Sequence, residues 1–424
     1  MAENIITLKV EKLAGLGDGM GMHNGRKVFL PYVCTGDTVR ARIIRRTTDA
    51  DYAQLVEVIS PSPERIAPPC PHFGICGGCT LQHISDTAYA EFKQTMAREA
   101  VRKAGFDPNL TVELARFPAG SRRRVELKAA GGKLGFYAEG SHTIIDIGEC
   151  MVLEPELLSL IMRLKLQLIS APGTTRLQIN GVDGGYDLLL EGAAKIDPSQ
   201  SPEIRRISVR ENNKIRIVYE SGPVIMTLAG AEVEVPPGAF LQASRDAQAL
   251  MTNLVVQAAA GCVQILDLFS GIGTYSFPLL ASASVTAVEG EQSMVEAMKK
   301  VVFSKPPAAL LSAPEEVVTV APVRTPAFSF KALQRDLFQR PYTAAELKPY
   351  DIVIINPPRA GAKAQAEELA ASQVPKIVMV SCNPATFTRD ARLLKAGGYE
   401  LVKLTPVDQF VYSSHLELVA EFEK

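Results

Sequence analysis

Alternating apolar and polar residues dominate the first 60 positions of the chain. The stretches ITLKVEKL, KVFLPYV, DTVRARIIRRT and YAQLVEVI follow this two-residue period, and Gly- and Asp-rich turns separate them. Such a period predicts half-buried β-strands. Short strands with a positively charged face are typical of a small OB-type β-barrel, which we predict for residues 1–60.

The pattern changes from residue 61 to residue 235. SPSPERIAPPCP carries five prolines and reads as a linker, and AYAEFKQTMAREAVRKAG after it has a helical pattern. From about residue 110 the alternation returns in RRRVELKAA, KLGFYAEG, TRLQING, YDLLLEG and KIRIVYE, interrupted by one helix, EPELLSLIMRLKLQLISA. We therefore predict a central β-rich domain over 61–235.

Short apolar runs separated by helical patterns fill residues 236–424. VQILDLF, SVTAVEG, DIVIINPP and KIVMVSC are such runs. Strands that alternate with helices predict a parallel sheet with helices on both faces, that is, an α/β domain. The Pro- and Ala-rich stretch 304–328 supports no prediction of conformation.

Composition narrows the class of protein. Apolar residues make up 47% of the 424 residues, enough for sizeable cores, and the N-terminus lacks a secretory signal. No apolar run is long enough to span a bilayer, so we expect a cytoplasmic protein without a membrane partner. A net charge of −1 argues against nonspecific coating of nucleic acid. RNA binding would need local patches, for which VRARIIRR (39–46) and SRRR (121–124) are candidates, although either could be a solvated face.

A glycine-rich turn follows the first predicted strand of the α/β domain, in LDLFSGIGTYSFPLL (266–280). Gly271 and Gly273 would let a ligand approach the backbone at the carboxyl end of that strand. Glu289 ends the next strand, where an acid typically binds ribose hydroxyls, and Asp336 is placed to accept from an adenine amino group. Because a third glycine is missing, the series favours S-adenosylmethionine over a dinucleotide.

NPPR (356–359) follows the strand DIVII. Two prolines after a strand make a rigid ledge beside the predicted cofactor. A similar ledge with an aromatic fourth residue serves enzymes that methylate exocyclic amines of bases, but Arg359 stands in that position here. The ledge therefore keeps a base-amine methyltransferase as one alternative and a plain strand-ending turn as another.

Four cysteines suggest a metal centre. CPHFGICGGC has the spacing C-x5-C-x2-C, and IGEC offers a fourth thiol. Four thiolates suit either zinc or an iron–sulfur cluster, and the spacing leaves both open. Two histidines, His72 and His83, could also complete a zinc site. The four cysteines are Cys70, Cys76, Cys79 and Cys150.

Cys382 directly follows the apolar run KIVMV, where a cysteine is most often a small buried hydrophobe. It lies one strand after NPPR, however, at the edge of the sheet where ligands bind. A thiol beside a methyl donor is suited to methylation of carbon 5 of a pyrimidine, because thiolate addition at carbon 6 activates carbon 5. A base must then remove the carbon-5 proton, and SSHLELVAEF offers Glu417 and His415.

At this point the motifs resemble a known family, the uracil-5 RNA methyltransferases that act on bacterial 23S rRNA and tRNA. The resemblance rests on DLFSGIGTYSFPL, VEGEQSMVEAM, NPPRAG, VSCNPATFTRD and HLELVA. CPHFGICGGC with GEC is similar to the branch that carries a 4Fe–4S cluster, and residues 1–60 resemble its TRAM domain. The family's fold would make residues 236–424 a Rossmann-like class I S-adenosylmethionine-dependent methyltransferase domain.

The resemblance implies roles for particular residues. Cys382 would be the nucleophile and Glu417 the base. The cluster would be held by Cys70, Cys76, Cys79 and Cys150. The cofactor would contact Gln242, Tyr275, Glu289, Asp336 and Asn356 beside the glycines Gly271 and Gly273. The family usually has Asp where this chain has Asn356, so that position departs from the pattern.

The resemblance also implies a substrate and a set of rivals. Since a TRAM-like domain and a cluster occur together, we expect an enzyme that methylates a uridine of 23S rRNA rather than of tRNA. We also expect a monomer. The alternatives are a tRNA uracil-5 methyltransferase, a base-amine methyltransferase, which would need no thiol, and a non-catalytic RNA-binding protein.

Overall fold

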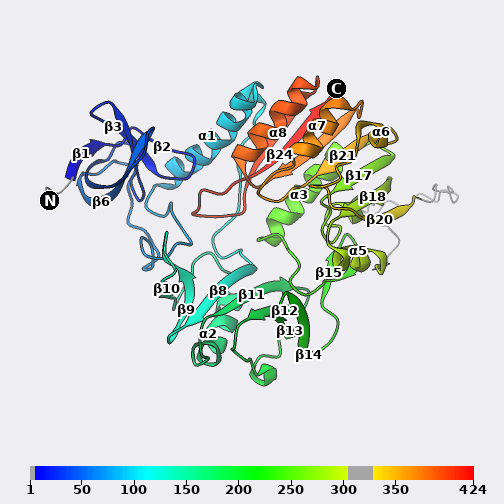
Figure 1. Ribbon diagram of the computed structural model, residues 1–424, viewed down its shortest axis with the longest axis horizontal. Coiled ribbons are helices and arrows are strands. Elements are labelled where there is room, and N and C mark those ends of the chain that lie inside the picture. Colours follow the sequence, from blue (N-terminus) through cyan, green and yellow to red (C-terminus); the bar gives the residue numbers. More distant parts are fainter. Residues whose placement is uncertain (1–4, 304–327) are drawn as a thin grey trace, which may run out of the picture.

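The computed structural model describes residues 5–303 and 328–424, and the strands of these residues form four sheets. Figure 1 shows an N-terminal lobe, a central lobe below it and a C-terminal lobe that contains the last strands of the chain. All but the last residue of the Pro- and Ala-rich stretch 304–328 lie outside the described residues.

The N-terminal lobe is a six-stranded mixed sheet in the order β1-β5-β6-β4-β3-β2. The predicted alternation is borne out by its core, in which Leu8, Val28 and Val39 are buried. The third strand was not predicted, because its sequence GMGMH lacks β-branched residues. Gly21 is required there, since a Cβ would lie 2.3 Å from the Lys9 carbonyl oxygen. The strands are β1 (Ile5–Lys9), β2 (Lys12–Leu13), β3 (Gly19–His23), β4 (Arg26–Leu30), β5 (Thr38–Arg46) and β6 (Ala50–Ser60).

The central lobe is a seven-stranded sheet in the order β10-β9-β8-β11-β12-β13-β14. The predicted helix is α2 (Pro155–Ile169), and its buried Leu157, Leu160 and Leu164 pack in one core with the sheet. The strands are β8 (Arg124–Ala130), β9 (Lys133–Tyr137), β10 (Ile144–Asp146), β11 (Thr175–Val182), β12 (Gly185–Glu191), β13 (Ile204–Glu211) and β14 (Lys214–Glu220). Two short 3-10 helices, η1 (Pro108–Leu110) and η2 (Pro198–Gln200), lie in the connections.

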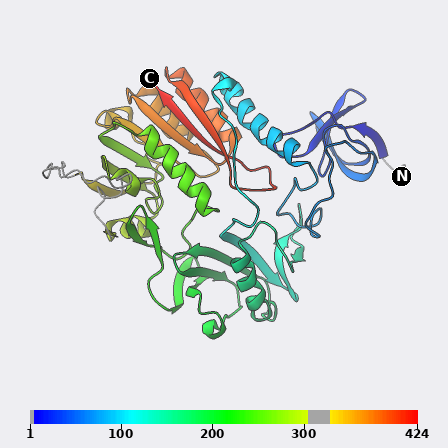
Figure 2. The same ribbon diagram turned by 180° about the vertical axis from the view of Figure 1, so that it is seen from behind.

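The C-terminal lobe has the predicted parallel sheet with helices on both faces. The order is β20-β18-β17-β21-β22-β24-β23-β7, and only β24 among these runs against its neighbours. Alternate residues of one strand enter two cores, Ile354 on the face of α3 and α5 and Ile355 on the face of α1, α7 and α8. Figure 2 shows α3 against its face of the sheet.

The strands of this sheet are β7 (Ala115–Arg116), β17 (Gln264–Leu268), β18 (Ser284–Glu289), β20 (Phe330–Gln334), β21 (Ile352–Ile355), β22 (Lys376–Ser381), β23 (Glu400–Asp408) and β24 (Glu417–Glu423). The helices are α1 (Asp86–Ala104), α3 (Arg245–Ala258), α4 (Ser276–Leu279), α5 (Gln292–Lys299), α6 (Ala344–Leu347), α7 (Lys363–Ala371) and α8 (Pro384–Ala396).

Two segments expected in the central domain pack with the C-terminal lobe. The α1 residues Ala97 and Val101 share a core with α8, and β7 adds a strand beside β23. A three-stranded sheet of β15 (Ile225–Leu228), β16 (Ala231–Glu234) and β19 (Val302–Phe303) joins the α3 core through Met226. The domain boundaries at 60 and 235 remain predictions, with these segments crossing between lobes.

Candidate active site

The predicted site residues of the α/β domain meet at one edge of its sheet. Strands β17, β18, β21 and β22 run parallel, so their carboxyl ends share an edge. Glu289 is the last residue of β18. The turns after β17, β21 and β22 carry Gly271, Asn356 and Cys382, respectively. Glu417 begins β24, which runs antiparallel to β22, and therefore reaches the same edge.

The glycine-rich turn has an open side and a closed side. Gly271 and Gly273 have φ angles of 59° and 89°, which favour glycine. A Cβ on Gly273 would lie 2.4 Å from the Phe277 ring, whereas one on Gly271 would meet nothing within 4 Å. The Glu289 carboxylate accepts from the Gly271 N–H at 2.9 Å, which holds the turn against β18. The open side over Gly271 can admit a ligand.

Asp336 lies two residues beyond β20, at the same end of the sheet. Its Oδ1 accepts from the N–H of Phe338 at 2.9 Å, and no described residue donates to its second oxygen. The Phe338 ring is 54% exposed and packs against Phe269 with the ring centroids 5.5 Å apart. The free carboxylate oxygen and the exposed ring can both face a ligand of the turn.

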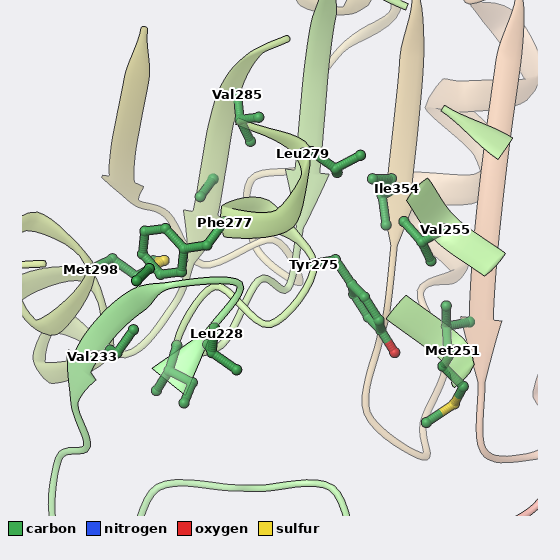
Figure 3. Packing of buried hydrophobic residues seen from close by; sticks show 14 of the residues in the cluster. Leu228, Val233, Met251, Val255, Tyr275, Phe277, Leu279, Val285, Met298 and Ile354 are labelled. Atoms are coloured by element: carbon green, nitrogen blue, oxygen red, sulfur yellow. The ribbon is translucent and has the colours of Figure 1, made fainter. Parts of the chain in front are cut away.

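Tyr275 and Asp267 bury polar atoms beside the turn. Among the described residues, Oδ1 of Asp267 has no hydrogen-bond partner, and the Tyr275 hydroxyl makes no bond of ordinary geometry. Burial raises the pKa of Tyr275, and a contact with the Gln242 side chain offsets part of the rise. Burial raises the pKa of Asp267 to about 7, and Oδ2 accepts from Ser276 at 2.5 Å. Figure 3 shows the Tyr275 ring within the core that includes Met251 of α3. Unsatisfied buried polar atoms at this turn fit a site for a polar ligand.

Gln242, Gln409 and Glu417 form one buried hydrogen-bonded row. Nε2 of Gln409 donates to Oε1 of Gln242 and to Oε1 of Glu417, both at 2.9 Å. Glu417 is 4% exposed, and burial raises the pKa of its carboxyl to about 7. Gln409 is not a residue that the sequence singled out, because nothing in its local pattern distinguishes it from other polar residues after a strand.

Cys382 is partly exposed at the turn between β22 and α8. Burial, and then the charge of Glu417, raise the pKa of its thiol to about 11. Arg359 lowers that pKa through its charge and a hydrogen bond, so it offsets part of the rise. Asn383 caps α8 and donates from Nδ2 to the Arg359 carbonyl at 3.1 Å, which ties the thiol turn to NPPR.

His415 also lies at this site, against Arg359. Nη2 of Arg359 is 2.6 Å from Nε2 of His415. Burial, and then the charge of Arg359, lower the pKa of His415 to about 4. His415 is therefore neutral near pH 7 and a weaker base than Glu417, the other candidate from the sequence.

A buried ion pair holds the loop that carries Gln409 and His415. Nζ of Lys93 in α1 lies 2.9 Å from Oδ1 of Asp408, and both side chains are almost fully buried. Lys93 also donates to the His415 carbonyl, while the Tyr89 hydroxyl donates to Oδ2 of Asp408 at 2.5 Å. The sequence did not indicate this network, because its members are more than 300 residues apart.

The four candidate metal-binding cysteines come together. Cys70, Cys76, Cys79 and Cys150 line one pocket with Phe136. No three metal-binding side chains of the described residues lie close enough to hold a single ion. His72 lines the pocket but His83 does not, so a zinc site completed by His83 is not supported.

The prediction of a basic surface patch at 121–124 is wrong for Arg123, which is buried. Arg123 is 1% exposed, and its Nε donates to the Gln242 carbonyl at 3.1 Å. Its Nη2 donates to Oε1 of Gln248 at 2.7 Å. Arg123 is buried because it joins the central lobe to the segment before α3. In the 39–46 candidate, by contrast, Arg40, Arg42, Arg45 and Arg46 are exposed.

Known proteins show similarity over nearly the whole chain. A family model described as tRNA (Uracil-5-)-methyltransferase matches residues 226–423. An uncharacterized RNA methyltransferase of Rhizobium meliloti is 36% identical over 99% of both chains. The 23S rRNA (uracil(1939)-C(5))-methyltransferase RlmD of Pectobacterium atrosepticum is 29% identical over 98% of this chain and 93% of its own.

Among solved structures, the fold is similar to that of the Pyrococcus abyssi tRNA (uracil-54, C5)-methyltransferase in complex with S-adenosyl-L-homocysteine. The TM-score is 0.71 at 22% identity, with 98% of this chain and 100% of that chain covered. No helix of the described residues is long and apolar enough to cross a membrane.

Proposed function

Because the chain belongs to the RNA uracil-5-methyltransferase family, we propose that it methylates carbon 5 of a uridine in 23S rRNA, with S-adenosylmethionine as the methyl donor. The 23S rRNA enzyme RlmD of Pectobacterium atrosepticum, similar over nearly the whole chain, supports this substrate. The observation that carries the proposal is the placing of Cys382 and a buried Glu417 at one edge of the sheet, with Arg359 beside both.

Cys382 is the nucleophile of this proposal. Its thiolate adds to carbon 6 of the uracil, and the electrons of the carbon 5–carbon 6 double bond move to the ring as an enolate. Carbon 5 is then nucleophilic and would take the methyl group, while the electron pair of the broken carbon–sulfur bond would stay on the donor sulfur as a neutral thioether. Arg359 favours the thiolate, since its charge and hydrogen bond lower the pKa of Cys382. When bound, S-adenosylmethionine supplies a positively charged sulfonium with an electrophilic methyl group.

Glu417 is the base that completes the reaction. Its carboxylate removes the proton from carbon 5, the electrons of that bond restore the double bond, and the thiolate of Cys382 leaves carbon 6. A pKa of about 7 suits this role, because a base works best when its pKa is near the operating pH. We assign the role to Glu417 rather than to His415, whose pKa burial and Arg359 lower to about 4.

The methyl donor would be held at the glycine-rich turn. The open space over Gly271, the buried Tyr275 hydroxyl, which makes no bond of ordinary geometry, and the free oxygen of Asp336 support this placement. Glu289 would accept from one ribose hydroxyl at Oε2, which accepts from the turn and can accept once more. Its Oε1 already accepts from the N–H groups of Gly290 and Glu291. Gln242 and Asn356 complete the proposed cofactor contacts.

The cysteine pocket would hold a 4Fe–4S cluster. Four thiols that line one pocket match the four cysteine ligands of such a cluster. Such a cluster would join the loop after Cys70 to the segment at Cys150.

We expect Cys150→Ser to abolish the broad visible absorbance of the anaerobically purified protein, whereas Cys262→Ser, outside the pocket, should retain it. Colourless wild-type protein with bound zinc would contradict the cluster.

The N-terminal lobe would bind RNA as a TRAM-like barrel. The exposed arginines of β5 and the close approach of Gly21 to Lys9, which brings β3 against β1, support this reading. We further propose that the protein acts as a monomer in the cytoplasm, where rRNA is accessible.

The proposed function has a direct test. The protein is incubated with S-adenosylmethionine and 23S rRNA that contains 5-fluorouridine, and a covalent protein–RNA product is sought on a denaturing gel. Fluorine at carbon 5 cannot be removed as a proton, so the enzyme stays bound through Cys382. Cys382→Ala should give no adduct, and Cys262→Ala should give as much as wild type. Absence of adduct with folded wild type would refute the proposal.

The same assay separates the rivals. A tRNA enzyme would trap fluorinated tRNA and not rRNA. A base-amine methyltransferase would transfer the methyl group without an adduct and would tolerate Cys382→Ala. A non-catalytic RNA-binding protein would shift the RNA on a native gel with neither product.

A further inference from the structure

Gln409 occupies a central position in the site without a part in the reaction as proposed. Its side chain is 2% exposed and lies between two residues with assigned roles. One amide group donates to both of them, Gln242 on the cofactor side and Glu417 on the base side, at 2.9 Å each. Its oxygen accepts from the Ala243 N–H at 3.1 Å. Both the donor group and the acceptor of the amide are therefore in use.

The bond from Gln409 favours the ionised state of Glu417 and so opposes burial, which favours the neutral acid. An N–H donor stabilises the charged carboxylate more than the neutral acid. The Ala243 N–H in turn fixes which end of the Gln409 amide faces the carboxylate, because only the amide oxygen can accept from it. A backbone contact 166 residues away therefore determines the orientation of the donor.

Other charged and titratable groups also act at Glu417. Arg359, from the turn after β21, favours the ionised carboxylate. Cys382, from the turn after β22, and Tyr275, from the glycine-rich turn, are each influenced by the Glu417 charge. Gln409 differs from these groups because it is uncharged and because it also contacts Gln242.

We propose that Gln409 is a positioning residue that holds Glu417 as an ionised base and aligns it with the cofactor side of the site through Gln242. The inference rests on the proposed function, since it assigns to Glu417 the removal of the carbon-5 proton. It adds that the orientation and charge of this base depend on a neutral amide that touches no reacting atom.

The variant Gln409→Met tests this role, because methionine nearly matches glutamine in shape and lacks the donor. Loss of one bond to a charged group should raise the pKa of Glu417 by about one unit. Well below the pKa of Glu417, the ionised fraction of this carboxyl should be about tenfold smaller in the variant than in wild type. Above about pH 9 the two fractions should be equal. The slow step then becomes proton removal, so a methylated covalent protein–RNA adduct should accumulate on ordinary, unfluorinated RNA.

Gln409→Glu provides the second variant. This variant keeps the shape of the side chain and the acceptor for the Ala243 N–H, but it places a second carboxyl beside Glu417. The rise of the methylation rate with pH should therefore shift to higher pH than in Gln409→Met. The measurements are single-turnover methylation across the range from about pH 5.5 to about pH 9.5, which brackets the expected shift, and the amount of methylated adduct at each pH.

The outcomes are distinct. A Gln409→Met protein that is slower by the same factor at every pH, without adduct, would reduce Gln409 to a packing residue and overturn the inference. A wild-type rate and pH profile in the variant would do the same. Wild type that forms no adduct with 5-fluorouridine RNA would instead contradict the proposed function itself.

Discussion

At the scale of single residues, the site places a thiol and a carboxyl in an environment that favours their neutral forms. Burial raises the pKa of Cys382 to about 11 and that of Glu417 to about 7. Both groups must lose a proton to act as proposed. Arg359 is the nearby cation that favours both charged forms, although in the sequence it was notable only as the residue that replaces an aromatic.

The buried carboxyl of Glu417 should reduce stability at high pH. Its folded-state pKa lies above the ordinary value of 4.5, so its contribution is complete below pH 4.5 and is lost as pH rises through 7. We expect Glu417→Gln to raise the free energy of unfolding at about pH 8 by about 3 kcal/mol and to have no effect at about pH 4.5. Thermal unfolding at the two pH values measures this.

Glu423→Gln, on the same strand but exposed, is the matched control and should show no such pH dependence. Equal stability of Glu417→Gln and wild type at the higher pH would mean that the Glu417 carboxylate is better solvated than the structure indicates.

At the scale of elements, the loop 409–416 between β23 and β24 positions residues of the site. It carries Gln409 and His415 and leads directly into Glu417. Lys93 of α1 anchors both of its ends, through Asp408 and through the His415 carbonyl. The helix thus acts on the site although it contributes no side chain to the reaction.

Removal of one member of this buried ion pair should be costly. Lys93→Met leaves the charge of Asp408 buried without its partner, and we expect a loss of about 3–5 kcal/mol of stability. Hydrogen exchange should show faster exchange of the amides of residues 409–416, and methylation should slow with it.

The double variant Lys93→Met/Asp408→Asn should recover part of this stability, because it removes both charges. Lys103→Met, on the exposed side of α1, is the control. No change in exchange of the loop would show that strands β23 and β24 alone hold it.

At the scale of the molecule, residues 122 and 123 connect the lobes. Arg122 lines the cysteine pocket, and its N–H donates to the Val152 carbonyl at 3.0 Å. The next residue, Arg123, donates through its N–H to the Ala243 carbonyl at 2.9 Å. The proposed cluster and the proposed cofactor site are thus joined through two adjacent residues.

RNA binding should depend on the N-terminal lobe more than on net charge. We expect Arg42→Glu/Arg46→Glu on β5 to weaken RNA binding and to make the plot of log affinity against log salt concentration shallower, by about one for each phosphate that the variant no longer neutralises. Filter binding at several salt concentrations measures this slope.

Lys299→Glu/Lys300→Glu, at two exposed lysines where α5 ends, makes the same charge change and is the matched control. Figure 1 shows α5 in the C-terminal lobe, away from the N-terminal lobe. This control should leave RNA binding unaltered, because these lysines lie away from the N-terminal lobe. An equal weakening in both variants would point to a nonspecific effect of charge.

The sequence by itself determined four parallel strands of the α/β domain and where the predicted site residues lie along them. Apolar periodicity predicts the parallel strands, and parallel strands necessarily bring Gly271, Glu289, Asn356 and Cys382 to one edge. Each of these residues follows or ends a strand, so its position can be inferred from local pattern alone.

Only the tertiary structure decided which polar residues are buried and what they contact. Gln409 meets Gln242 across 167 positions, Lys93 meets Asp408 across 315, and Arg123 is buried rather than part of a basic surface. The physical reason is that a local pattern records the face of one element, whereas burial of a polar side chain depends on donors and acceptors that other elements bring to it. The pKa values of Cys382 and Glu417 follow from that burial, and therefore from packing that no single segment encodes.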